Sequence, residues 1–376
     1  MNIAIFTTFD YSLKTWKDSG VLIRELEFFN YLSKKYNLNF TFVTYGDKND
    51  TELIQNYSNF KVIPIYSLVK LRKNKSIRYL NSLIIPFKLK KYLKDIDLIY
   101  QNQLLGSWVS IITKYVIKKP LMIRTGYDMY SFSKFASNSS FKILLYKMLT
   151  LFSISLCDLF TVTSKTDYQI YEKNFKKFKD KVLIRPNWVK STKRNPLNNR
   201  NKNKILSVGR LVDQKNFELL IKEFQNTNDL LEIDIVGEGG QLGHLSELGK
   251  DNKVKLNFLG KLTNEKLNLI YQDYIYYFST SKYEGNPKTV LEAMAAGCIV
   301  VLSNIPNHTE LVEDGVNGFL FELKNPELLK LFKSATKDLE LLEKISLNAK
   351  TEIDDSNSLN QIAHLFYEDF VSLNSG

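Results

Sequence analysis

Two glutamates in the second half of the chain bracket a tight loop where an anion could bind. Glu284 and Glu292 have seven residues between them within the run 283–297, which reads YEGNPKTVLEAMAAG. Residues 275–280 before it are rich in β-branched and aromatic side chains, and another apolar run begins at residue 299. The pattern predicts a strand, a loop, a helix and a second strand.

The helix in this unit is expected to cover residues 288–296. Asn286 can cap its N-terminus, Pro287 suits its first turn, and Gly297 can end it. The loop then directs backbone N–H groups and the positive end of the helix dipole toward one point, which favours a phosphate. An ordinary βαβ connection with two solvated glutamates is the alternative interpretation.

A glycine and two cations form a second motif, at the start of the same half of the chain. The strand expected at 205–208 delivers Gly209 and Arg210, and Lys215 comes just before a helix capped near Asn216. Gly209 allows close backbone approach, the Arg210 guanidinium offers a fork for phosphate oxygens, and Lys215 adds a point charge. Solvated surface cations are the alternative, but the nearby glutamate loop favours a diphosphate site.

These motifs resemble those of the retaining glycosyltransferases of the glycosyltransferase B fold, family 4. The two glutamates and the AMAAG helix end are similar to the family's E-x7-E motif, and residues 209–215 to its G-R-x-x-x-x-K diphosphate site. The resemblance implies a nucleoside diphosphate sugar as donor. It implies three catalytic residues, with Glu284 beside the donor sugar and Arg210 and Lys215 at the diphosphate. Glu292 would accept hydrogen bonds from the ribose.

The same resemblance implies further donor-binding residues. Gly209 and the loop of Asn286, Pro287, Lys288 and Thr289 would face the phosphates. Many relatives have Phe-Gly in place of Asn286 and Pro287, and Pro287 lacks an N–H that could bind phosphate. Gly237, Gly239 and Gly260 resemble glycine turns near the nucleotide.

The glycines after the strand expected at 231–236 also suggest a dinucleotide fingerprint. Gly237 and Gly239 have its first spacing, but Leu242 stands where the third glycine is required and Gly243 is one place late. We therefore reject this interpretation.

The first half offers weaker matches on the acceptor side. Ser19 and Gly20 resemble a glycine-rich loop of the family, which often has two glycines where this chain has one. All three histidines lie in the second half, whereas many relatives place a first-domain histidine against the donor sugar. Tyr127 or Asp128 is expected to take a related place, with a structural turn as the alternative.

We predict no metal site and no cofactor other than the donor substrate. Asp95 and Asp97 mimic the metal-binding D-x-D of other glycosyltransferases. They stand at the start of the strand expected at 97–100, whereas ligands of such sheets bind at the carboxyl ends of strands. We therefore reject a metal site there.

Strands and helices must alternate to position these residues. Apolar runs predict strands at 2–8, 40–45, 61–65, 97–100, 121–124 and 159–163 in the first half, and at 205–208, 231–236, 254–258, 275–280, 299–302 and 319–321 in the second. Helical periodicity lies between them, as at 21–35. The pattern favours an α/β protein of two doubly wound, Rossmann-like parallel-sheet domains facing across a cleft.

The domain boundaries follow from composition. Residues 1–190 are predicted to form an acceptor-side domain, and the polar run 191–204 an interdomain linker. Residues 205–357 would form the donor domain. The resemblance implies that the last helix, within residues 358–376, returns to the first domain.

Length and composition indicate a globular protein in a reducing cytoplasm. The chain has 376 residues, 44% of them hydrophobic, and its two cysteines lie one in each half. The N-terminal residues are expected to form a strand and not a signal peptide. Residues 141–160 are the most apolar window, but three charges interrupt it, so we expect a buried or interfacial helix.

The charge is divided unevenly along the chain. Residues 1–190 carry a net charge of +17 and residues 191–376 carry −5. A basic first half predicts a polyanionic partner, and we expect the anionic inner face of the plasma membrane. Residues 70–94 and 141–152 combine lysines with apolar side chains that either enter the interface or face the core.

The sequence thus predicts a metal-independent, retaining glycosyltransferase that moves a hexose from a nucleotide sugar to a glycan or lipid-linked acceptor. The expected setting is bacterial surface polysaccharide synthesis. A nucleotide-sugar epimerase of the same fold is the alternative enzyme, and the histidine-free first half speaks against it. A basic nucleic-acid-binding protein is the non-enzymatic alternative, which the acidic second half disfavours.

Overall fold

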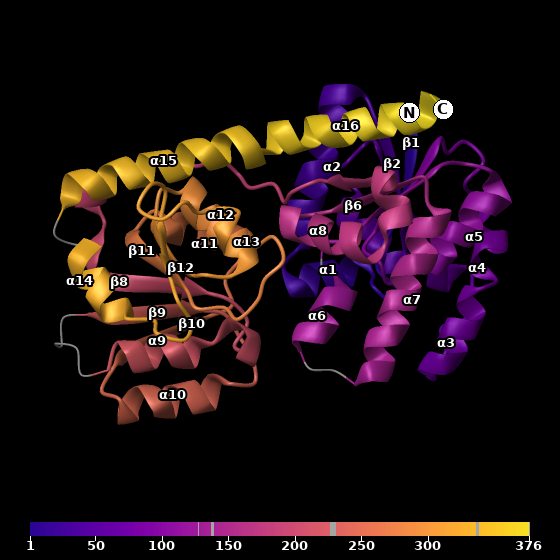
Figure 1. Ribbon diagram of the computed structural model, residues 1–376. Helices are drawn as coiled ribbons and strands as arrows, with labels where there is room; N and C mark the ends of the chain where they lie inside the picture. Colours follow the sequence, from indigo (N-terminus) through magenta and orange to yellow (C-terminus); the bar gives the residue numbers. More distant parts are fainter. Residues whose placement is uncertain (127, 137–138, 226–230, 336–337, 376) are drawn as a thin grey trace. The chain divides into compact units, whose positions relative to one another are not determined.

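The computed structural model describes residues 1–126, 128–136, 139–225, 231–335 and 338–375. The chain forms two compact units (Figure 1). Unit 1 consists of Met1–Pro186 together with Ala363–Gly376, and unit 2 of Asn187–Ile362.

Unit 1 is built on a parallel sheet of seven strands in the described part of the chain. Their order is β3-β2-β1-β4-β5-β6-β7, so the chain starts in the middle of the sheet and winds to both sides. Ile5 and Phe6 point to opposite faces and are both buried, which shows that both faces are covered. The strands are β1 (Asn2–Phe6), β2 (Asn39–Thr44), β3 (Phe60–Pro64), β4 (Leu98–Asn102), β5 (Leu121–Arg124), β6 (Leu159–Val162) and β7 (Val182–Ile184).

Helices connect these strands. The described α-helices are α1 (Leu13–Ser19), α2 (Leu22–Tyr36), α3 (Lys75–Ser82), α4 (Ile85–Leu89), α5 (Ser107–Ile117), α6 (Met129–Phe135), α7 (Ser140–Leu156) and α8 (Lys165–Asn174). Short 3-10 helices are η1 (Lys48–Ile54), η2 (Ile65–Ser67) and η3 (Lys176–Lys181).

Unit 2 has a parallel sheet of six described strands. Their order is β10-β9-β8-β11-β12-β13. Neighbouring residues of β8 point to opposite faces of the sheet and pack in two different hydrophobic cores. Ile205 packs in the core that contains α9, and Leu206 in the core that contains α12. Helices therefore cover both faces of the sheet. The strands are β8 (Asn201–Val208), β9 (Glu232–Val236), β10 (Lys255–Gly260), β11 (Tyr274–Ser279), β12 (Ile299–Ser303) and β13 (Phe319–Phe321).

The helices of unit 2 follow the same alternation. They are α9 (Phe217–Glu223), α10 (Leu242–Asp251), α11 (Asn264–Tyr271), α12 (Lys288–Ala295), α13 (Pro306–Thr309), α14 (Leu328–Ala335) and α15 (Leu339–Asn357), with η4 (Leu197–Asn199) and η5 (Asp213–Lys215). Helix α16 (Leu359–Ser375) begins in unit 2 and continues into unit 1. Two parallel α/β sheets confirm the predicted fold class.

The polar run 191–204 belongs to unit 2 in the structure and already contains the start of β8. Arg200 is only 5% exposed, and its guanidinium donates to the carbonyls of Ala296 at 2.7 Å and Gly297 at 3.1 Å. Arg194 forms an ion pair with Glu343 at 2.6 Å. Charged side chains thus fix a segment whose composition resembles a linker.

The last residues of α16 pack on unit 1. Asp369 forms a two-pronged ion pair with Arg185, with N···O distances of 2.6 and 2.7 Å, and Phe366 is buried beside Tyr100. One helix therefore contributes its first residues to unit 2 and its remainder to unit 1.

Candidate functional site

The loops that follow strands β8, β9 and β10 meet at the carboxyl edge of the unit 2 sheet, because parallel strands end at the same edge. The Gly209 N–H donates to the carbonyl of Val236 at 2.9 Å, and the Gly237 N–H to that of Gly260 at 2.9 Å. A Cβ on Gly237 would lie 1.9 Å from the carbonyl oxygen of Gly209. A glycine is therefore required at position 237 for the loops after β8 and β9 to contact each other.

Gly239 has a similar packing role. A Cβ there would lie 2.4 Å from the carbonyl oxygen of Leu211, whose N–H donates to Glu238 at 2.9 Å. The predicted contacts of Gly237, Gly239 and Gly260 with a nucleotide stay predictions. The structure explains two of these glycines by the close approach of backbone to backbone.

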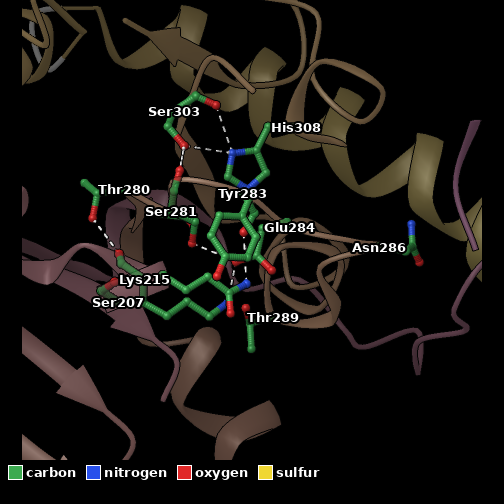
Figure 2. Close-up of polar contacts among 12 residues, drawn as sticks. Ser207, Lys215, Thr280, Ser281, Tyr283, Glu284, Asn286, Thr289, Ser303 and His308 are labelled. Carbon is green, nitrogen blue, oxygen red and sulfur yellow. Dashed lines mark hydrogen bonds and ion pairs between the residues drawn. The ribbon is translucent and has the colours of Figure 1, made fainter. Parts of the chain in front are cut away.

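Lys215 reaches the buried face of the glutamate loop. It ends η5 and is followed by Asn216 in the left-handed conformation, with φ of 52°. Its methylene groups pack on Gly209, and a Cβ on that residue would lie only 3.1 Å from the Cδ and Cε atoms of Lys215. Its ammonium forms an ion pair with the carboxylate of Glu284 (Figure 2).

Glu284 is almost completely buried, and its carboxylate is held by two groups. The hydroxyl of Ser281 donates to Oε1 at 2.7 Å, and the Lys215 ammonium binds the same oxygen. Burial alone would raise the pKa of Glu284, but Lys215 and Ser281 together lower it below its usual value. The group is therefore an anion at neutral pH.

Ser303 and His308 lie next to the Glu284 loop, and neither belongs to a sequence motif. His308 Nδ1 lies 2.9 Å from the carbonyl of Ser303 and donates to it, and the Ser303 hydroxyl donates to the carbonyl of Ser281 at 2.6 Å. Burial lowers the pKa of His308 to about 4. A lone histidine near a Pro turn gave no signal in the sequence, because only the fold places it beside Glu284 (Figure 2).

Four further bonds lock the loop of Lys215 to the loop of Glu284. The Thr280 hydroxyl lies 3.1 Å from the carbonyl of Lys215 and 2.9 Å from that of Asn216. Gln214 donates its side-chain N–H to the carbonyl of Tyr283, and its own carbonyl accepts from the Lys282 N–H, both at 2.9 Å. The charged pair is thus held by a rigid frame.

Glu292 and Thr289 lie on α12, and each accepts from the hydroxyl of a buried tyrosine. The Tyr277 hydroxyl donates to Thr289 Oγ1 at 2.9 Å, and the Tyr271 hydroxyl to Glu292 at 3.3 Å. Burial raises the pKa of Tyr277, and the nearby carboxylates of Glu284 and Glu292 raise it further. Both predicted glutamates therefore act on the pKa of one buried phenol.

Asn286 does not cap α12, so that expectation is wrong. Its side-chain oxygen accepts the N–H of Asn187 at 2.8 Å, and Pro287 occupies the capping position without a side-chain hydrogen bond. Figure 2 shows Asn286 apart from the Glu284 cluster. Gly297 follows the helix with a left-handed φ of 72°, as predicted.

Arg210 and Lys288 complete the predicted donor site. Arg210 is exposed and lies close enough to Tyr283 to oppose the rise that burial and Asp213 cause in the pKa of that phenol. Lys288 is half-buried at the first position of α12. Arg210 thus offers an accessible guanidinium next to the Glu284 loop.

The predicted residues of unit 1 have local structural contacts. Gly20 ends α1 with φ of 81°, and the Ser19 hydroxyl donates to the carbonyl of Trp16 at 3.0 Å. Asp128 caps α6 and accepts from the buried Tyr171 hydroxyl at 3.1 Å. Tyr127 lies outside the described residues.

The carboxylate of Asp97, in the rejected D-x-D motif, also has a local contact. It accepts the backbone N–H of Asn2 at 2.8 Å and so joins β1 to the turn before β4. Asp95 contributes its carbonyl to the side chain of the same asparagine at 2.9 Å.

Comparisons with known proteins find similarity to glycosyltransferases. Residues 189–352 match the family model described as glycosyl transferases group 1. The chain is 30% identical over 127 residues to the UDP-N-acetylglucosamine–peptide N-acetylglucosaminyltransferase GtfA subunit of Streptococcus agalactiae, covering 33% of this chain and 25% of that protein. It is 31% identical over 181 residues to an uncharacterized glycosyltransferase of Haemophilus influenzae, covering 46% of this chain and 50% of that protein.

The chain thus spans a quarter to a half of the length of these two relatives. Its fold extends further than its sequence similarity. The crystal structure of Anabaena HepE in complex with UDP and glucose superposes with a TM-score of 0.73 at 18% identity, covering 99% of this chain and all of that one. Residues 189–352 therefore match the group 1 glycosyl transferases, and the chain as a whole has the glycosyltransferase B fold.

Proposed function

We propose that this protein is a glycosyltransferase that takes a sugar from a nucleoside diphosphate donor. The observation that carries the proposal is the buried Lys215–Glu284 pair, which lies at the carboxyl edge of the unit 2 sheet with Arg210 exposed beside its loop. The match of residues 189–352 to the glycosyl transferase model supports it.

The donor diphosphate would bind between Arg210, Lys215 and the first amides of α12. These groups stabilise the negative charge that develops on the departing diphosphate, which is the main demand of the reaction. Two protein cations can meet this demand, so the proposed reaction needs no dedicated metal. Lys215 would share its charge between the diphosphate and Glu284.

We assign Glu284 to the donor sugar. Its carboxylate is ionised and fixed by Lys215 and Ser281, so it can accept a hydrogen bond from a sugar hydroxyl without first reorganising. Glu292, which accepts from the Tyr271 hydroxyl, would accept from the ribose.

The proposed reaction retains the configuration of the anomeric carbon. The acceptor hydroxyl attacks from the side of the leaving diphosphate, the new C–O bond forms as the bond to the diphosphate breaks, and a phosphate oxygen takes the proton. No enzymic nucleophile is assigned. The support for retention is the similarity of the two-glutamate loop to that of the family 4 enzymes.

We propose a glycan or lipid-linked acceptor and a place on the cytoplasmic face of the plasma membrane. One relative transfers N-acetylglucosamine to a peptide, by its name, and a structural neighbour binds UDP and glucose. The charge of +17 on residues 1–190 supports a partner that is anionic. A membrane meets this requirement, and so does an anionic glycan.

A thermal-shift screen with nucleoside diphosphate sugars tests the donor assignment. A ligand at 100 times its dissociation constant stabilises the folded state by about 2.7 kcal/mol, so the matching donor should raise the Tm. Arg210→Ala should weaken its binding by roughly tenfold to a hundredfold, because charge-assisted hydrogen bonds contribute about 1.5–3 kcal/mol each. Lys250→Ala, an exposed cation at the end of α10, should bind normally. No shift with any donor would contradict the proposal.

A further inference from the structure

Unit 1 exposes large apolar side chains on α3, α4 and the turn between them. Leu80 is 68% exposed and Phe87 63% exposed, and Ile77, Leu83 and Ile84 are also exposed. In contrast, Ile85, Leu89 and Leu93 are buried in the core, which decides between the two alternatives for these three residues. The apolar residues of this segment are thus divided between the core and the solvent.

Helix α7 has a second exposed apolar stripe. Phe141 is 77% exposed, and Leu144, Leu145, Met148 and Phe152 follow it on the same side at helical spacing. Ile143, Tyr146 and Leu149 occupy the opposite side and pack against the core. The helix therefore has two apolar sides, of which the core uses only one.

The two exposed stripes belong to neighbouring helices. Helix α5 contacts both α4 and α7. The Trp108 indole of α5 donates to the Ser82 hydroxyl of α3 at 2.8 Å. The ring of Tyr79 on α3 also lies 5.7 Å from that of Trp108, measured between centroids. We call the ten exposed side chains on α3, α4 and α7 named above the apolar face.

A basic cavity lies beside this face. It has a volume of about 350 Å³ and is lined by Lys88, Lys90, Lys91 and Lys94, with Phe87 and Tyr92. Phe87 belongs both to the cavity and to the apolar face. Residues 70–94 hold nine Lys and Arg and no acidic residue, and residues 139–157 hold two lysines and no acidic residue.

We propose that unit 1 docks on an anionic lipid bilayer, with the apolar face in the interface and a lipid head-group phosphate in the lysine cavity. Apolar side chains bordered by basic ones suit the boundary between acyl chains and anionic head groups. A second copy of the chain is a poor occupant, because two such faces would bring like charges together. The proposal rests on the proposed function only in that a lipid-linked acceptor would lie in the same membrane.

Sedimentation with vesicles tests this proposal on the full chain. Wild type should sediment with vesicles of phosphatidylcholine and phosphatidylglycerol in equal parts, and stay in solution with phosphatidylcholine alone. The cavity variant Lys88→Gln/Lys90→Gln/Lys91→Gln/Lys94→Gln should bind roughly fivefold more weakly for each lysine that approaches the surface. Added salt should weaken wild-type binding and reduce this difference, because it screens the lysine charges.

A matched variant controls for net charge. Lys34→Gln/Lys48→Gln/Lys173→Gln/Lys176→Gln removes four exposed lysines from other segments of unit 1 and should bind anionic vesicles nearly as well as wild type. A second variant, Leu80→Ser/Phe87→Ser/Leu144→Ser, should lose binding although its charge is unchanged. All these positions are exposed, so the Tm should stay close to that of wild type.

Three results would overturn the proposal. The first is that the cavity variant and its control lose vesicle binding equally. The second is that the serine variant binds vesicles as well as wild type does. The third is that wild type forms a dimer in solution and the serine variant does not. The thermal shift with nucleoside diphosphate sugars is measured without lipid. A protein that binds a donor but no vesicle would therefore refute the docking surface and the proposed membrane location, and would leave the proposed sugar transfer standing.

Discussion

The ammonium of Lys215 binds the carboxylate of Glu284, 69 residues further along the chain, and both side chains are largely buried. Sequence motifs assign these residues to different parts of the donor, one to the diphosphate and the other to the sugar. The structure shows that they also position one another. A change at either residue should therefore affect both the stability of unit 2 and the chemistry of the site.

Lys215→Ala should destabilise the protein far more than Arg210→Ala. Removing Lys215 leaves the Glu284 carboxylate buried without its cation, a change that typically costs about 3–5 kcal/mol. Arg210 is exposed, and its removal should change the free energy of unfolding by no more than about 0.5 kcal/mol. Urea unfolding at neutral pH measures both values.

The double variant Lys215→Ala/Glu284→Gln is the control for this pair. Glutamine carries no charge, so the double variant should regain much of the stability that Lys215→Ala loses. Equal stability of Lys215→Ala and Arg210→Ala would show that the ion pair contributes nothing to folding.

The two glutamates should have separable effects on turnover. Glu284→Gln should lower the rate of transfer strongly, because the carboxylate is assigned to the reacting sugar. Glu292→Gln should mainly weaken nucleotide binding, because the ribose is remote from the bond that breaks. Donor titrations and initial rates of both variants distinguish these roles, and the same pattern of defects in both would refute the division.

His308 should make the stability of unit 2 depend on pH. Its pKa falls from the usual 6.5 to about 4 on folding, since burial disfavours the imidazolium. Below pH 6.5 the unfolded chain binds a proton that the native state does not, so stability is lost as the pH falls toward 4. The loss should reach roughly 3 kcal/mol, at about 1.4 kcal/mol for each pKa unit.

The measurement is the free energy of unfolding in urea at a series of pH values. His308→Asn keeps a side-chain N–H that can donate to the carbonyl of Ser303, but it has no group that titrates in this range. Its stability should therefore change less with pH. The same pH dependence in wild type and variant would assign the effect to other groups.

The architecture could be predicted from the sequence because buried parallel strands are continuous apolar runs. The strands expected at 121–124 and 319–321 match β5 and β13 residue for residue. No pattern predicts the three-residue strand β7, since Val182–Ile184 is short and follows a lysine-rich segment. The polar run 191–204 has the composition of a linker, and composition does not reveal the buried contacts of Arg200.

The site could be predicted only as far as local motifs reach. The spacing of Glu284 and Glu292, and of Arg210 and Lys215, follows from single loops. The Lys215–Glu284 bond and the support from Ser303 and His308 join loops of different strands, and no local pattern records them. Asn286 shows the converse error, since a good capping residue bonds instead to Asn187.

Transfer should persist in excess EDTA. The prediction follows from Arg210 and Lys215, whose charges are assigned the task that a divalent cation performs in other glycosyltransferases. The measurement is the initial rate with and without chelator. Loss of activity that Mn²⁺ or Mg²⁺ restores would contradict the leaving-group chemistry proposed here.

The most direct test is the release of nucleoside diphosphate from a panel of nucleotide sugars, comparing wild type with Glu284→Gln. Wild type should release it from at least one donor, and added acceptor should accelerate the release. Glu284→Gln should be slower by about 10²–10³-fold, the usual effect of removing one preorganised polar group from a reacting centre. No release by wild type above the protein-free rate, or equal release by both proteins, would contradict the account.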